Sequence, residues 1–113
     1  MTIKQQRLSN QIAKHLANII QFEMKDPNLG LITITDVSVT HDLSLAKVYV
    51  MVSGNTKQKQ LSLDALDQAR GFIRSSLAKE LTTYKTPEIR FIYDDSLDKA
   101  ERIDELIKKT HQD

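Results

Sequence analysis

The stretch LSLDALDQARGFIRSSLAKEL, residues 61–81, decides how this chain folds. Its apolar residues recur at the spacing of one face of an α-helix, namely Leu63, Leu66, Ile73, Leu77 and Leu81. Gly71 stands in the middle, although a glycine inside a helix costs about 1 kcal/mol relative to alanine. Glycine tolerates the backbone angles of a kink and allows another backbone to approach closely. We therefore expect two short helices that meet at a bend at Gly71.

A straight helix would also place Arg70 in the wrong environment. At about 100° per residue, Arg70 would lie about 40° from Leu66, inside the apolar arc. Phe72 would lie about 120° away on the other side. A bend at Gly71 removes both conflicts.

Length and composition indicate one folded domain spanning residues 1–113. The chain has 113 residues, of which 40% are hydrophobic and 27% charged, as in ordinary globular proteins. The absence of cysteine excludes disulfides, thiol nucleophiles and cysteine metal sites, and it favours a cytoplasmic protein. We expect neither a signal peptide nor a membrane span, because the first residues lack an apolar core and no apolar run is long enough.

Charge is unevenly distributed along the chain. Residues 43–93 hold eight Lys/Arg against four Asp/Glu, whereas residues 94–113 hold four against seven. A basic middle and an acidic end are expected when one face meets a polyanion and another stays in solvent. Four excess charges also occur on surfaces without a partner, so this pattern alone does not separate the two cases.

The first half of the chain predicts a helix followed by a hairpin. Thr2 and Gln5 fit a capping box, and apolar periodicity then extends the helix to about Met24. Residues 25–30 form a breaker loop around Pro27. The period then becomes alternating over residues 32–39, with a change of phase that predicts a β-bulge near residues 35–36. A turn at residues 41–44 leads into a second strand over residues 45–52.

The second half completes the order of elements. Residues 54–60 are polar enough to predict a loop, and Ser62 is a plausible cap for the bent helix pair. Pro87 precedes a short third strand at residues 89–93, and Ser96 caps a last helix within the acidic segment 94–113. The predicted fold class is α+β, in the order α-β-β-α(kink)α-β-α. A three-stranded sheet with helices packed on one face follows from this order.

Five blocks of sequence, in this order, resemble the ribosome-binding factor A family of bacterial small-subunit assembly factors. The blocks are KDPNLG at 25–30, the hairpin from Asp42-Leu43 through residues 46–50, ARGFIR at 69–74, PEIRF at 87–91 and Asp95-Ser96. The resemblance implies a type II KH-like fold in which an Ala-x-Gly kink, here Ala69 and Gly71, replaces the usual Gly-x-x-Gly loop. It also implies a protein without enzymatic activity or cofactors that binds the immature small (30S) ribosomal subunit and assists maturation of its 16S rRNA.

The resemblance and the charge pattern together indicate an RNA-binding surface. In KH modules the turn between the paired helices approaches the sugar-phosphate backbone. Arg70 and Arg74 lie one helical turn apart beside the kink and are our first expectation for phosphate contacts. The full set of expected RNA-binding residues is Arg7, Lys14, Lys47, Arg70, Arg74, Lys79, Lys85 and Arg90.

Each of these expectations has an ordinary structural alternative. Arg70 and Arg74 could only pair with Asp67 or other carboxylates on a solvated face. The aromatic residues Tyr49, Tyr84 and Phe91 could stack on bases, but aromatic residues in or beside strands more often belong to the core. Members of the family tend to be richer in basic residues just before Pro87, whereas residues 81–85 of this chain supply one lysine, Lys85. An alternative function is a protein-binding module whose kinked helix docks a partner protein.

The sequence offers little support for an enzyme, a metal site or a small-molecule substrate. His41, Asp42 and Ser44 are the residue types of a catalytic triad, but residues so close in one turn cannot align as base, orienter and nucleophile. Asp94, Asp95 and Asp98 could gather a cation, yet carboxylates at the start of a helix are expected from the helix dipole alone. We expect a monomer with no metal, whose partners are the small ribosomal subunit and its 16S rRNA.

Overall fold

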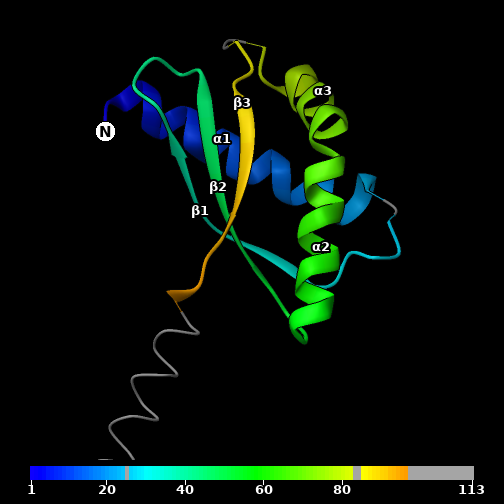
Figure 1. Ribbon diagram of the computed structural model, residues 1–113. Helices are drawn as coiled ribbons and strands as arrows, with labels where there is room; N and C mark the ends of the chain where they lie inside the picture. Colours follow the sequence, from blue (N-terminus) through cyan, green and yellow to red (C-terminus); the bar gives the residue numbers. More distant parts are fainter. Residues whose placement is uncertain (25, 83–84, 97–113) are drawn as a thin grey trace, which may run out of the picture.

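The computed structural model describes residues 1–24, 26–82 and 85–96. Within them, a three-stranded sheet is covered on one face by helices (Figure 1). The elements are α1 (Ile3–Asn18), the π-helix η1 (Ile19–Glu23), β1 (Ile32–Val39), β2 (Leu45–Val52), α2 (Thr56–Gln68), α3 (Arg70–Glu80) and β3 (Glu88–Tyr93). This confirms the predicted α+β class and order up to the third strand. The predicted last helix lies outside the described residues beyond Ser96.

The capping box predicted at the start of the chain is present in α1. The Gln5 amide N–H donates to Thr2 Oγ1, and the Gln5 side chain accepts from the Thr2 amide. The helix passes behind the strands (Figure 1) and buries Leu8, Ile12 and Leu16 against them. Its last turn widens into η1, where the Met24 N–H donates to the Ile19 carbonyl at 3.0 Å.

The sheet has the order β1-β2-β3, with β1 antiparallel to β2 and β2 parallel to β3. The register of the hairpin shifts between Ile34 and Asp36, which confirms the predicted bulge. Even-numbered residues of β2 are buried and its odd-numbered residues are half-buried, so one face of the sheet meets the helices and the other faces solvent.

The second helix begins earlier than predicted, so the loop over residues 54–60 and the cap at Ser62 were wrong. Asn55 is the cap: its side chain accepts from the Gln58 N–H, and Gln58 bonds back to the Asn55 N–H. Ser62 is buried inside α2, where its hydroxyl accepts from the Gly30 N–H and donates to the Asn28 carbonyl. The error arose because the first turn of α2 is almost entirely polar and shows no apolar period.

Two helices do replace one long rod, but the break lies at Ala69 rather than at Gly71. Ala69 has φ −89° and ψ 5°, between the end of α2 and the start of α3. Gly71 belongs to α3, is exposed, and has no atom within 4 Å of where a Cβ would stand. The prediction that Gly71 causes the bend was therefore wrong. Gly71 does not have a positive φ, and no backbone among the described residues lies close to it.

Alanine at Gly71 and at Gly54 should have opposite effects on stability. Gly71→Ala removes backbone entropy from the unfolded chain without a clash and should raise the free energy of unfolding by up to about 1 kcal/mol. Gly54 has φ +120°, and a Cβ there would meet the Gln58 side chain that caps α2. Gly54→Ala should therefore lower the free energy of unfolding by about 1–3 kcal/mol. Urea unfolding of both variants measures the difference, and equal effects would contradict this geometry.

Asp94 links the end of β3 to the bulge of β1. Its carboxylate accepts bonds from Ser96 Oγ and from Thr35 Oγ1, and these bonds lower its pKa from 3.8 to about 2. A carboxylate with a lowered folded-state pKa stabilises the fold above its unfolded pKa and loses that contribution as pH falls. The free energy of unfolding should thus decrease between about pH 5 and pH 2. In Asp94→Asn, urea midpoints measured across this range should depend less on pH, and an unchanged dependence would contradict the link.

Candidate nucleic-acid interface

The eight predicted RNA-binding residues all reach the surface, with Lys47 half-buried and the others exposed. They do not form one cluster. The structure divides them among the open face of the sheet, a groove beside β3, the exposed side of α3 and the exposed side of α1.

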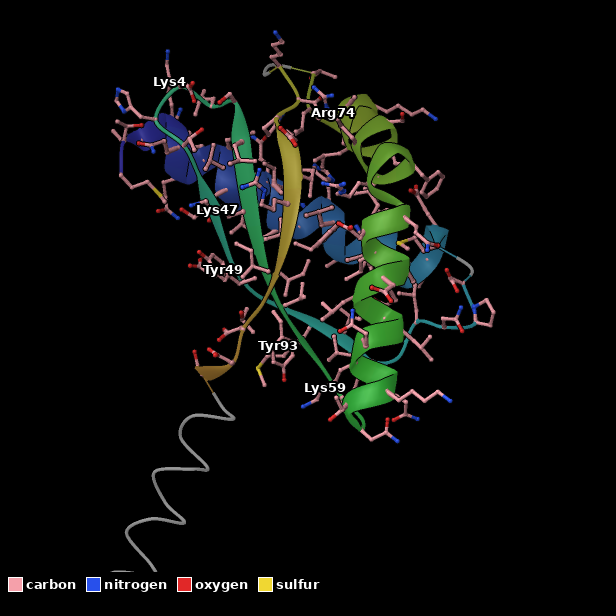
Figure 2. The ribbon with its side chains drawn as sticks, viewed as in Figure 1. Lys4, Lys47, Tyr49, Lys59, Arg74 and Tyr93 are labelled. Carbon is pink, nitrogen blue, oxygen red and sulfur yellow. The ribbon has the colours of Figure 1, made fainter. Side chains whose placement is uncertain are left out.

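Lys47 and Arg90 are direct neighbours on the open face of the sheet. Lys47 of β2 pairs in register with Arg90 of β3 and, on its other side, with Ser38 of β1. In Figure 2, Lys47 and Tyr49 project from the side of the sheet that the helices leave uncovered. Like charges opposite each other on a sheet repel, so a bound anion between them would relieve the repulsion. This pair therefore suits a phosphate group.

Arg74 and Lys85 line a groove of about 470 Å³ at the start of β3. Arg74 Nη2 donates to the Thr86 carbonyl at 3.2 Å, which holds the guanidinium toward the chain that enters β3. Asp42 and Glu88 also line this groove, so its charge is mixed. The Asp42 carboxylate is occupied within its own turn: bonds from Ser44 and Thr40 lower its pKa.

Arg70 makes the local pair that the sequence offered as an alternative. Its Nε donates to the Asp67 carbonyl at 3.2 Å and lies 3.2 Å from Asp67 Oδ1. Its side chain is 45% exposed, and an exposed pair of this kind contributes at most about 1 kcal/mol. Arg70 thus turns back toward α2, whereas Arg74 turns toward β3. Whether both reach one stretch of RNA stays a prediction.

The remaining cations lie apart from the groove. Lys79 is in the last turn of α3. Arg7 and Lys14 are exposed on α1, seven residues apart and therefore on the same side of the helix, about 10 Å from each other along its axis. They form a second basic edge.

Tyr49 lies outside the core, although aromatic residues in strands more often belong to it. It pairs with Asp36 and Ile92 on the open face of the sheet, next to Lys47, and is half-buried rather than in the core. The signal was available, because Tyr49 alternates with the buried Val48 and Val50. Phe91 does pack against the core, and Tyr84 lies outside the described residues.

The described residues offer no arrangement for metal chemistry or for crossing a membrane. No group of three or more His, Asp or Glu side chains among them could hold a metal ion. Asp94 is used by Thr35 and Ser96, and Asp98 lies outside the described part. None of the helices described here combines the length and apolar character that a membrane span requires.

Comparison with known proteins gives a consistent result over nearly the whole chain. Residues 4–107 match the family described as Ribosome-binding factor A. The ribosome-binding factor A of Staphylococcus carnosus is 43% identical over 110 residues, which cover 97% of this chain and 96% of that protein. That of Macrococcus caseolyticus is 38% identical over 113 residues, or 100% of this chain and 99% of the relative.

Solved structures agree with the sequence relatives. A solution structure from Thermotoga maritima, described as a candidate ribosome binding factor A, is 32% identical, has a TM-score of 0.73 and covers 83% of this chain and 90% of its own. The crystal structure of ribosome-binding factor A from Thermus thermophilus is 28% identical with a TM-score of 0.70, covering 79% and 93%. The fold is thus KH-like, as the resemblance implied. This chain belongs to the ribosome-binding factor A family.

Proposed function

We propose that this protein binds the immature small ribosomal subunit in the cytoplasm and assists maturation of its 16S rRNA without catalysing a reaction. One observation carries the proposal: Thermus thermophilus ribosome binding factor A coordinates fitted into a map of a 30S complex match 79% of this chain with a TM-score of 0.65. The relative's partner is the 30S subunit, and this chain shares the fold of that relative. A single domain acting as a monomer suffices for this role.

The proposed contact surface runs around the edge strand β3. Arg90 of β3 and its neighbour Lys47 of β2 lie on the open face of the sheet, and Arg74 and Lys85 line the groove at the start of the strand. Arginine side chains suit paired phosphate oxygens, whereas lysines act as point charges. The other expected RNA-binding cations lie apart from this surface, on α3 (Arg70 and Lys79) and on α1 (Arg7 and Lys14), and would contact further stretches of the RNA backbone. Such a surface follows the path of an RNA backbone and reads its shape.

Recognition by phosphates and shape explains how such a protein acts without chemistry. Base sequence is read through base edges, whereas contacts to the backbone fix position and orientation. A protein held in this way favours the rRNA conformation whose phosphates fit its cations. We propose that it biases the immature ends of the rRNA toward the conformation in which they are processed.

Salt dependence tests the proposal. Binding of the purified protein to immature small subunits should weaken linearly in log K against log salt, with a slope set by the number of neutralised phosphates. Lys47→Ala should reduce the magnitude of that slope by about one. Lys57→Ala, which removes an exposed lysine outside the nominated set, is the matched control and should leave the slope unchanged. Co-sedimentation across a salt series measures all three, and binding insensitive to salt would contradict the proposal.

A further inference from the structure

Exposed apolar side chains gather around one loop of the protein, residues 26–31. The structure describes six large hydrophobic residues as exposed, and three of them line grooves at this loop: Leu31 (72% exposed), Leu61 (39%) and Phe72 (50%). Exposed apolar residues scattered singly need no explanation, but a contiguous group rimmed by polar residues marks an interaction site.

Two adjoining grooves at this loop contain Leu31 and Phe72 in their linings. The first, of about 700 Å³, lies between η1 and the start of β1 and is lined mainly by apolar residues, including Ile20 and Leu31. The second, of about 430 Å³, extends from the loop to Ala69 and Phe72 at the helix break. Both grooves are lined by Met24, Asp26 and Pro27. We call this continuous surface the loop groove.

The loop groove is held in shape by specific hydrogen bonds. Asp26 Oδ1 accepts from the Asn28 N–H at 2.9 Å and closes the turn. The buried Ser62 of α2 ties down the loop by accepting from the Gly30 N–H at 2.9 Å and donating to the Asn28 carbonyl at 3.1 Å. A groove fixed in this way loses little entropy when a partner binds.

The charged side chains that the structure describes at the loop groove disfavour an RNA backbone. Its charged lining residues among those the structure describes are Glu23 and Asp26, both acidic. Acidic groups repel phosphates, and an apolar floor offers them no hydrogen bonds. The complementary occupant is an apolar side chain flanked by positive charges.

We infer that the loop groove docks a protein segment of the small ribosomal subunit, one that carries an apolar side chain flanked by Lys or Arg. This inference rests on the proposed function and adds a protein contact to the RNA contacts. A particle built on a polyanion requires cationic protein segments to neutralise it, so it offers this chemistry beside the RNA. The protein would grip the RNA around β3 and a protein segment at the loop groove.

Site-specific photo-crosslinking tests the inference on the full chain. Benzoylphenylalanine placed at Leu31 or at Phe72 should cross-link, on immature small subunits, to a Lys- or Arg-rich protein segment identified by mass spectrometry. The same probe at Ile3 is the control, because Ile3 is as exposed as Leu31, at 72%, but lies at the far end of α1. It should not reach that segment.

Cross-links only to rRNA, only to a second copy of the chain, or to nothing despite normal co-sedimentation would overturn the inference. Loss of co-sedimentation by the unmodified chain would overturn the proposed function as well.

Affinity measurements distinguish the loop groove from the RNA surface. Leu31→Ser should weaken binding to the particle about three- to tenfold, because an exposed apolar anchor is lost. The salt slope should not change, since no phosphate contact is removed. Ile3→Ser should bind as the original protein does, and circular dichroism should show that all variants are folded. Unchanged affinity of Leu31→Ser, or a slope reduced by about one, would contradict a protein contact at this site.

Discussion

Reversing the charge of Arg70 and Arg74 together should abolish co-sedimentation with immature small subunits. Each substitution to glutamate removes a cation beside the helix break and adds repulsion toward the RNA backbone. We expect a loss of affinity of about 100-fold or more near physiological salt. The fold should survive, because both side chains are exposed and the Arg70–Asp67 pair contributes at most about 1 kcal/mol. Sedimentation of mixtures with immature subunits measures the loss.

The matched control for this experiment reverses Lys4 and Lys57. Both are exposed lysines outside the nominated set, and their reversal changes the net charge by the same amount. This control separates the local effect at the helix break from a general effect of net charge. Normal binding by a folded Arg70→Glu, Arg74→Glu protein, or equal losses in both double variants, would show that these two arginines are not the RNA contacts.

The second large effect concerns the core. Leu66→Ala should lower the free energy of unfolding by about 2–5 kcal/mol, because Leu66 is fully buried within the cluster that joins the helices to the sheet. Small domains are stable by only about 5–15 kcal/mol, so this loss is a large fraction of the total. Urea unfolding followed by circular dichroism measures it.

Leu61→Ala is the control on the same helix. Leu61 is 39% exposed, so its truncation leaves little cavity and should cost less than about 1 kcal/mol. The contrast tests which face of α2 meets the sheet. Similar losses at the two positions would contradict the burial of Leu66 and hence the packing of the bent helix pair.

Local sequence signals predicted most of the fold because they act over a few residues. The capping box of Thr2 and Gln5 and the alternation of β2 follow from hydrogen bonding and side-chain period, which neighbours in the chain determine. The bulge was predicted for the same reason: the apolar phase changes within residues 32–39, and a slip by one residue would expose the whole strand.

The errors occurred where tertiary contacts override local pattern. The start of α2 was missed because its first turn is polar, and the Asn55–Gln58 capping box was not recognised. Ser62 has the residue type of a cap but serves in the interior, where it binds a loop 32 residues earlier in the chain. Tyr49 was grouped with core aromatics, although the strand period placed it on the open face.

The sequence by itself determined the order of elements, the presence of a break over residues 69–71 and the residue types available for binding a polyanion, because these depend on local propensity and composition. Only the tertiary structure decided which cations meet. Lys47 and Arg90 are 43 positions apart yet adjacent across parallel strands, while Arg70 and Arg74 engage different neighbours. The loop groove likewise joins α1, β1 and the helix break, and such a surface exists only once distant segments pack together.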